Sequence, residues 1–516
     1  MAFQADNKKI AKNTIILYIR QILIMVITLY TSRVVLQTLG ADDYGIYNVV
    51  GGFVTMFNVI SGAFTVAISR FMAYVIGEGN EKKVGELFST ALMVQCCMGL
   101  FIVLLLATGG VWYVTNIMVL PEGRTEAALW VLTFSTVSFF INLISVPYNA
   151  LIVAHEHMKA YAYIAIFEAV MKLLISFAII VSPLDKLITY SFLTVLSAVI
   201  VRLCYSGYCN RNFIGCKFRL RVHMSTLKEM MSFVGWAFLG NGAMVLRDQG
   251  TNMILNLFGG TIVNAARGIA QNVNNAVQSF VNNFMQATQP EITKLKATDQ
   301  IKEMHVLIFR SCRICYFLML IFTIPLSKNI DYVLMIWLGE VPKYTSAFVI
   351  LTLMDSLIAA LNNPLLYGVL AAGKIKVYEI VMSSMCMLTL VINYGMLSLG
   401  LTPVYVYIAL LIFRIFVMFS LVWQSKIYGL KWRDFIKHVA VRVVITTIVC
   451  VFAAVIIDFS FISIDFLKFL METGIIVLLN GCAIFMIGFS QLERKTILTF
   501  IKTKILPKIN VTGREK

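Results

Sequence analysis

The sequence predicts an all-α integral membrane protein with about 14 transmembrane helices. Of its 516 residues, 59% are hydrophobic and only 13% are charged, and the mean hydropathy is +0.84. Average soluble chains carry about a quarter charged residues. The apolar residues lie in runs of about 20–25, the length that a helix needs to cross roughly 30 Å of hydrocarbon. Composition and pattern therefore both predict a chain that crosses the membrane many times.

The predicted spans follow one another with short connections. They lie at 13–39, 44–76, 87–116, 126–153, 161–182, 187–208, 230–257, 262–289, 306–327, 345–372, 376–398, 403–424, 438–458 and 468–490. The first run follows Lys8, Lys9 and Lys12. Because it is too long for a signal-peptide core and has no small-residue cleavage site, we expect it to remain as the first span.

Basic residues are distributed unevenly between the two sides of the predicted membrane. Most of the 43 Lys and Arg residues fall in loops and tails on the side of the N-terminus. The loops of the other side hold Arg124, Lys186, Lys328, Lys343 and Lys468. The positive-inside rule then places both termini in the cytoplasm. The net charge of +17 thus reflects topology, so no nucleic-acid partner is expected, and the basic tail after Gln491 is expected to contact anionic membrane lipids.

The ten cysteines form neither a disulfide framework nor a metal pattern. Most sit in or beside predicted helices, and the Cys312–Cys315 pair has no second pair and no histidine at zinc spacing. We interpret them as small buried side chains. No metal site and no cofactor are expected.

The chain contains an internal repeat on either side of a long basic loop. A shift of 220 residues aligns Gly40, Gly51, Thr55 and Asn58 with Gly260, Gln271, Asn275 and Gln278. A shift of 217 aligns Pro147, Ala154, Lys159 and Tyr161 with Pro364, Ala371, Lys376 and Tyr378. Because each repeat has six spans, an even number, the two bundles share one orientation and are related by a pseudo-two-fold axis along the membrane normal.

The repeat predicts the domain organisation. We expect an N-terminal six-helix lobe at 1–208, a basic cytoplasmic linker at 209–229, a C-terminal six-helix lobe at 230–424, and two extra transmembrane helices with a basic cytoplasmic tail at 425–516.

One predicted helix, from Asn264 to Gln289, carries six Asn and four Gln. The polar residues recur at spacings of three and four, which places them on one face: Asn264, Arg267, Gln271, Asn275, Gln278, Asn282, Gln286 and Gln289. A surface helix of a soluble domain would show the same pattern. The surrounding apolar spans favour a wet cavity instead, because an amide that faces lipid is unsatisfied at a cost of roughly several kcal/mol.

Four further segments resemble a known superfamily. They are KKIAKNTIILYIRQ at 8–21, LGADDYGIYNVV at 39–50, SRFMAYVIGEGNEKKV at 69–84 and QPEITKLKATDQ at 289–300. With the two six-span halves and the trailing pair, the chain resembles the multidrug/oligosaccharidyl-lipid/polysaccharide (MOP) exporter superfamily. Within it, the chain is most similar to the Wzx-type flippases for O-antigen and capsule units. The resemblance implies a V-shaped pair of bundles in the inner (cytoplasmic) membrane, around a cavity that a lipid-linked sugar crosses by alternating access.

Several charged residues fall inside predicted spans, where each costs roughly 2.5–3.5 kcal/mol on insertion scales. Arginine binds phosphate through a two-pronged fork and keeps its charge when partly buried. We therefore expect five arginines to bind a substrate pyrophosphate: Arg33, Arg247 and Arg267, followed by Arg20 and Arg414. For each single arginine, a structural pair between helices is the alternative.

The remaining site predictions concern sugars and ions. The side chains expected to contact sugar hydroxyls are Gln271, Asn275, Gln278, Asn282, Gln286, Asn58 and Thr55. Glu168 and Lys172 are four residues apart and are expected to neutralise each other. Any coupling to H⁺ or Na⁺ would have to use Asp355, Glu168 or Asp248, and Asp355 is favoured because no cation adjoins it in the sequence.

Taken with the resemblance, these features predict a flippase that moves polyprenyl-pyrophosphate-linked oligosaccharide units, and the resemblance implies a role in O-antigen, capsule or exopolysaccharide synthesis. Polysaccharide polymerase and assembly proteins are its expected partners. A cation-coupled multidrug exporter of the same superfamily is the first alternative, although the excess of buried arginine disfavours it. A membrane polymerase or glycosyltransferase is the more remote one. The chain has no nucleophile–His–acid constellation and no Gly-rich phosphate loop, so we do not expect an enzyme.

Overall fold

The computed structural model describes residues 2–57, 68, 72, 81–155, 157–213, 224–372, 376–457, 459, 465–491 and 493–495. Within these ranges, the side chains of 2–20 and 224–241 and a few others lie outside the description. The described residues form helices and connecting turns and contain no strand. The predicted all-α fold class is therefore confirmed.

Residues 58–76 of the predicted span 44–76 lie outside the description except for Ile68 and Met72. Elsewhere, the helices of the first 212 residues follow the predicted spans closely. They are α1 (Ala2–Thr55), α3 (Glu81–Leu105), α4 (Val111–Asn116), α5 (Thr125–Leu143), α6 (Val146–Ala154), α7 (Met158–Ala178) and α8 (Lys186–Asn212). A π-helical turn, Leu106–Gly110, joins α3 to α4.

The rest of the chain begins with one very long helical element, α9. The elements are α9 (Met224–Ala297), α10 (Ile301–Lys328), α11 (Ile330–Leu338), α12 (Thr345–Ala371), α13 (Lys376–Ser398), α14 (Val404–Gln424), α15 (Trp432–Phe435), α16 (Val441–Ile456) and α17 (Asp465–Ala483). Among the described residues, 12 helical stretches are long and apolar enough to cross a membrane. They correspond to the 14 predicted spans because two stretches, Gln21–Thr55 and Gly242–Met285, each contain a turn at one glycine.

The two turns have nearly the same backbone geometry. Gly40 has φ 82° and ψ 171°, and Gly260 has φ 67° and ψ −169°. This region of φ/ψ space is accessible essentially only to glycine. Because the 220-residue shift aligns Gly40 with Gly260, the repeat seen in the sequence is also present in the backbone.

The chain packs as two compact units. The first comprises Met1–Val273, Leu334–Phe348 and Glu379–Ala409, and the second comprises Asn274–Val333, Val349–Tyr378 and Leu410–Lys516. These units differ from the predicted lobes, whose boundaries follow the sequence repeat rather than packing. The lobe boundaries stay a prediction.

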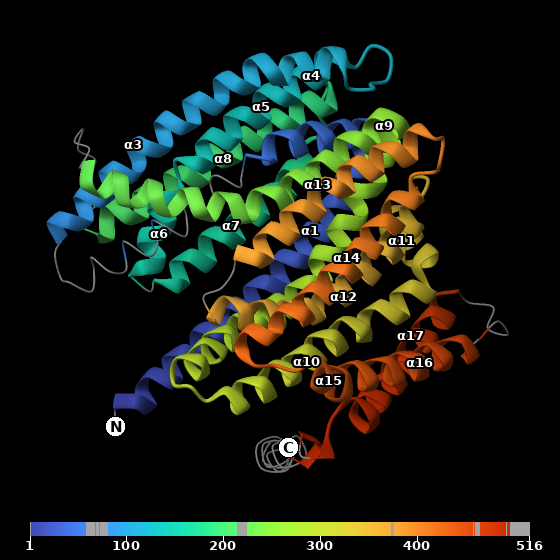
Figure 1. Ribbon diagram of the computed structural model, residues 1–516. Coiled ribbons are helices and arrows are strands. Elements are labelled where there is room, and N and C mark those ends of the chain that lie inside the picture. The colour runs from blue at the N-terminus through green and yellow to red at the C-terminus, as the bar shows by residue number, and fades with distance from the viewer. Residues whose placement is uncertain are drawn as a thin grey trace, which may run out of the picture. The chain divides into compact units, whose positions relative to one another are not determined.

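In the first unit, α5 lies against α8 and α3, and α1 packs on α7 and α5 (Figure 1). One buried cluster includes Ile46, Val50 and Leu132, so the segment of α1 after Gly40 is held firmly by apolar contacts. In the second unit, α10 packs on α16 and α17 (Figure 1).

Large apolar side chains are exposed along the outer faces of the helices. On α14, Phe416, Phe419 and Trp423 are 55–62% exposed, and α8 exposes Phe192 and Leu203 in the same way. A protein surrounded by water rarely exposes apolar surface on this scale. Together with the 12 apolar helical stretches, these faces mark a multi-pass membrane protein.

A charged cluster joins α1 to the start of α8 in the first unit. Arg124 contacts the carboxylates of Asp43 on α1 and Asp185 before α8, the latter at 2.5 Å. Asp185 also caps α8 by accepting hydrogen bonds from the backbone N–H groups of Leu187 and Ile188. Partial burial alone would raise the pKa of Asp185, but the hydrogen bonds from Arg124 and from these amides outweigh it and hold the pKa below its ordinary value.

We expect Asp185→Asn to lower the thermal stability at pH 7 and to matter less in acid. The lowered pKa means that ionised Asp185 stabilises the fold fully above the ordinary aspartate pKa, and that this contribution is lost as the pH falls through the lowered folded value. Asparagine keeps a capping oxygen, so the difference reports the ion pair. Thermal unfolding of the detergent-solubilised protein at pH 7 and near pH 3 measures it. A melting-temperature difference that stayed constant across this range would contradict the assignment.

Candidate functional site

The segments of α1 and α9 that follow the two glycine turns pack directly against each other in the first unit. A Cβ on Gly45 would lie 2.0 Å from the carbonyl oxygen of Thr261, and a Cβ on Gly268 would lie 2.7 Å from the side chain of Asn48. Asn48 and Gly268 are equivalent under the 220-residue shift. Two residues that are related by a two-fold axis and also contact each other must lie close to that axis. The contact between Asn48 and Gly268 therefore lies near the pseudo-two-fold axis.

Polar side chains cross the same contact. Thr261 donates a hydrogen bond to Asp42 at 2.6 Å, and the Asn252 side chain donates to the Asn48 carbonyl at 3.3 Å. Asn264, which is fully buried, donates to the backbone and side-chain oxygens of Asn252 at 2.9 and 2.6 Å. Asn264, the first residue of the predicted polar face, therefore fixes the packing of α9.

Beside this contact lies a cavity of about 370 Å³, which we name the amide cavity. Its lining residues are Tyr47, Asn48, Gly51, Gly52, Thr55, Asp248, Gln249, Asn252, Arg267, Gly268 and Gln271. The structure thus brings together four of the predicted site residues, Thr55, Asp248, Arg267 and Gln271. Four amides and two hydroxyl groups, those of Tyr47 and Thr55, dominate its polar wall, and the glycines let these groups approach one another closely.

Arg267 supplies a positive charge to the wall of the amide cavity. Its Nη2 donates to the backbone carbonyl of Asp248 at 2.9 Å, and its Nη1 lies 3.3 Å from the hydroxyl of Tyr407, a buried residue of α14. Both partners are neutral, and no carboxylate of the described chain lies within ion-pair distance of Arg267. The guanidinium is therefore held in position without being neutralised by a direct contact.

Arg247 and Asp248 form an ion pair of 2.7 Å. The Arg247 side chain is 14% exposed and that of Asp248 is 51% exposed, so the carboxylate is the more open partner and it lines the amide cavity. The positive charge of Arg247 is offset at short range. Arg247 and Arg267 carry two positive charges near the amide cavity and Asp248 carries one negative charge, which leaves an excess of one positive charge.

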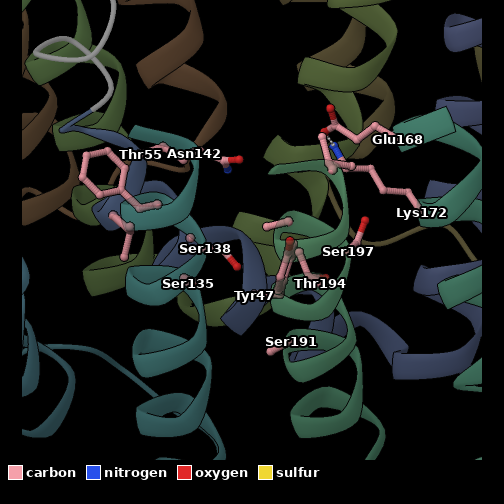
Figure 2. A pocket seen from close by; sticks show the side chains of 15 residues that line it. Tyr47, Thr55, Ser135, Ser138, Asn142, Glu168, Lys172, Ser191, Thr194 and Ser197 are labelled. Atoms are coloured by element: carbon pink, nitrogen blue, oxygen red, sulfur yellow. Dashed lines mark hydrogen bonds and ion pairs between the residues drawn. The ribbon is translucent and has the colours of Figure 1, made fainter. Parts of the chain in front are cut away.

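A second cavity, of about 290 Å³, lies among α1, α5, α7 and α8 (Figure 2). It is lined by Tyr47, Gly51, Val54, Thr55, Ser135, Ser138, Phe139, Asn142, Glu168, Lys172, Ser191, Thr194, Ser197, Ala198 and Val201. We name it the hydroxyl cavity. Glu168 and Lys172 pair across one turn of α7 at 2.7 Å, so their charges offset each other, as the sequence predicts. Tyr47, Gly51 and Thr55 line both cavities, which therefore adjoin.

Other predicted site residues lie elsewhere. Arg33 is half-buried on α1 and lines neither of these cavities. In the second unit, Arg414 of α14 donates two hydrogen bonds of 3.0 Å to the carboxylate of Asp355 on α12. Asp355 adjoins no cation in the sequence, but folding supplies one from a helix 59 residues away. The roles predicted for Arg33, Arg414 and Asp355 stay predictions.

Three predicted residues lie outside the description. They are Asn58, whose position is not described, and Arg20 and Gln286, whose side chains are not described. Further along α9, in the second unit, Asn275 and Asn282 are exposed and Gln278 is half-buried. The opposite face of α9 is more buried, with Val277 only 7% exposed. From Gln271 to Asn282 the predicted polar face is thus more exposed than the opposite face, whereas Asn264 at its start is fully buried.

Sequence reasoning missed the hydroxyl residues of the second cavity and the amides of Asn48, Gln249 and Asn252. The signal was present, because Ser135, Ser138 and Asn142 lie three and four residues apart on α5, and Ser191, Thr194 and Ser197 lie three apart on α8. Single Ser and Thr residues are common in membrane helices, where the hydroxyl bonds to a carbonyl of the preceding turn. Ser191 and Thr194 do so here, which disguises the stripes in the sequence.

A family model described as "Polysaccharide biosynthesis protein" matches residues 10–296, more than half of the chain. The chain belongs to this family. The match confirms the predicted membership of the MOP superfamily, to which the solved structures below also point. No sequence among the curated proteins matches the chain.

Solved structures with the same fold cover most of the chain. Lipid II flippase MurJ, in an inward closed conformation, superposes with a TM-score of 0.70 at 11% identity, over 91% of this chain and 98% of MurJ. An inward-facing MATE family multidrug resistance transporter of the MOP superfamily gives 0.66 at 13% identity, over 81% and 99%. A MOP superfamily transporter from Pyrococcus furiosus gives 0.57 at 13% identity, over 82% and 96%. At these identities the likeness shows the fold alone, and this chain has the helical fold of MurJ and of the MATE family transporter.

Proposed function

We propose that this polysaccharide biosynthesis family protein is a flippase for polyprenyl-pyrophosphate-linked oligosaccharide units. It would act in the inner (cytoplasmic) membrane with both termini in the cytoplasm, and it would expose its cavity alternately to the two sides. The observation that carries the proposal is Arg267, a guanidinium with neutral partners on the wall of an amide-lined cavity. Such a group is ready to take an anionic ligand.

The chemistry of the amide cavity fits both parts of this substrate. An arginine fork binds a pyrophosphate through two parallel hydrogen bonds, and neither Asp248 O nor Tyr407 Oη neutralises its charge. Amides both donate and accept hydrogen bonds, as sugar hydroxyls do. A lipophilic cation would meet the excess positive charge instead. This argument favours the flippase over a multidrug exporter, whose fold the chain shares.

Among the three carboxylates predicted for ion coupling, Asp248 suits the role best. Each of them contacts a cation at 3.0 Å or less, but only Asp248 lines the amide cavity and is about half exposed. A proton or Na⁺ that bound there would release Arg247 toward the substrate. Asp248→Asn is therefore expected to abolish acceleration of flipping by an imposed H⁺ or Na⁺ gradient. If the ion gradient still accelerated flipping in the Asp248→Asn variant, a group other than Asp248 would have to carry the coupling.

The proposal is tested with purified protein in proteoliposomes. A fluorescent polyprenyl-pyrophosphate oligosaccharide should change leaflets in the presence of the protein and not in protein-free vesicles. Efflux of a cationic dye, with no movement of the lipid-linked sugar, would instead support the multidrug exporter. Polymerase or assembly proteins as partners, and anionic lipids at the basic C-terminal tail beyond the described residues, belong to the same proposal.

A further inference from the structure

We propose that the hydroxyl cavity is the subsite for an uncharged sugar residue of the transported oligosaccharide. The inference rests on the proposed function and adds to it the chemical class of the sugar. It assigns a role to a cavity that the pyrophosphate chemistry of Arg267 leaves unused.

The position of the hydroxyl cavity suits a sugar attached to a bound pyrophosphate. Tyr47, Gly51 and Thr55 line it on one side and line the amide cavity on the other. A ligand that places its pyrophosphate at Arg267 can therefore extend past this segment of α1 into the hydroxyl cavity. Gly51 presents no side chain there, and open space surrounds it, since a Cβ added to it would meet nothing within 4 Å.

The walls of the cavity carry the kinds of polar group that bind sugar hydroxyls. Three side chains of α5, Ser135, Ser138 and Asn142, face the hydroxyls of Ser191, Thr194 and Ser197 on α8, with Tyr47 between the two helices (Figure 2). Ser191 and Thr194 donate to carbonyls of their own helix, which leaves their oxygens able to accept. The Tyr190 ring lies edge-on to Tyr47 at 4.9 Å and steadies it as a flat apolar surface for a sugar ring.

One side chain of the cavity is unsatisfied. Ser138 is 9% exposed, and its hydroxyl has no hydrogen-bond partner among the described residues. Buried polar groups in native proteins are nearly always paired with protein, water or ligand. A sugar hydroxyl would supply the partner that Ser138 lacks.

The two charged residues that line the hydroxyl cavity neutralise each other, which favours an uncharged sugar. Glu168 and Lys172, the charged residues of the lining, pair with each other at 2.7 Å, while their side chains remain 40% and 53% exposed. A single charge at this place would select a sugar of the opposite charge, whereas a closed pair leaves only hydrogen bonding. Breaking the pair should therefore change which sugars are accepted.

The test measures flipping of three fluorescent lipids in proteoliposomes. They are polyprenyl pyrophosphate without sugar, the same lipid with a neutral oligosaccharide, and the same lipid with a uronic-acid-containing oligosaccharide. For the double variant Ser138→Ala/Ser197→Ala, we expect the flipping rate of the neutral oligosaccharide lipid, relative to that of the sugar-free lipid, to fall about tenfold. Ser176→Ala is the matched control, because Ser176 is buried on α7, bonds to its own helix and lines neither cavity.

Specificity gives a second, independent measurement. Glu168→Gln leaves Lys172 without its partner and should raise the rate for the uronic-acid lipid relative to the neutral one. Lys172→Met should lower that ratio. Because Ser138 lacks a partner, its removal should not destabilise the fold, and thermal unfolding checks this for each variant.

The outcomes separate the two proposals. If both ratios stay at their wild-type values while Arg267→Ala slows every lipid, the hydroxyl cavity is not a sugar subsite and the proposed function stands. If the wild-type protein moves none of the three lipids, the proposed function fails, and the subsite fails with it.

Discussion

Replacing Arg267 with alanine is expected to reduce flipping of the pyrophosphate-linked oligosaccharide by about 100-fold. The substitution removes the guanidinium that faces the amide cavity with only Asp248 O and Tyr407 Oη as partners. Losing one partner of a buried charged contact with a ligand costs about 2–5 kcal/mol, which is consistent with a loss of this size. Arg267→Lys keeps the charge but loses the fork, so it should retain an intermediate rate.

The matched control for this prediction is Arg433→Ala, because Arg433 is an exposed arginine that lines neither cavity. Rates are measured in proteoliposomes at equal protein density, with thermal unfolding as the check on folding. An Arg267→Ala variant that flips the lipid at the rate of the control would remove the main support for an anionic substrate.

The second large effect is expected at Gly45, where α1 meets α9. A methyl group there would lie 2.0 Å from the carbonyl oxygen of Thr261, which is backbone and cannot swing aside. Gly45→Ala must therefore separate the two segments and disturb the bonds from Thr261 to Asp42 and from Asn252 to the Asn48 carbonyl. Overpacking of this kind costs about 1–3 kcal/mol or more, so the melting temperature should fall by several degrees and flipping should be lost.

Gly51→Ala is the control for stability. Gly51 lies on the same segment of α1, and a Cβ there would meet nothing within 4 Å. Thermal unfolding of the two variants should therefore differ clearly, with Gly51→Ala close to wild type. Equal melting temperatures for Gly45→Ala and Gly51→Ala would mean that the close approach at Thr261 does not hold the first unit together.

The membrane spans, the internal repeat and the polar face of α9 could be predicted from the sequence. Hydrophobic runs locate spans because membrane crossing requires a minimum apolar length. The repeat aligns Gly40 with Gly260, and both residues have a backbone conformation that only glycine adopts readily. The polar face of α9 was visible for a similar local reason, since helical spacing alone decides which residues share a face.

Contacts between distant residues could not be predicted in this way. Arg414 pairs with Asp355 across 59 residues, and Arg267 reaches Tyr407 across 140. No local pattern encodes either partner, so the sequence could not distinguish an arginine held by a carboxylate from one held by neutral groups. This distinction is what separates Arg267 from Arg414 as a candidate for the substrate.

The hydroxyl cavity could not be predicted from the sequence for a different reason. Its walls come from four helices, each of which contributes a few small polar side chains. Only packing turns these into one surface, and only the position of Tyr47 and Thr55 between the cavities connects that surface to Arg267.

The most direct test of an anion-binding cavity compares two lipids that carry the same oligosaccharide, one through a pyrophosphate and one through a monophosphate. Wild-type protein in proteoliposomes should flip the pyrophosphate lipid at least about tenfold faster, because a pyrophosphate diester carries two negative charges and a phosphate diester only one, and the charge of Arg267 has only neutral partners. Arg267→Gln, which removes the charge, should lose most of this preference. Equal rates for the two lipids in the wild-type protein would contradict the account.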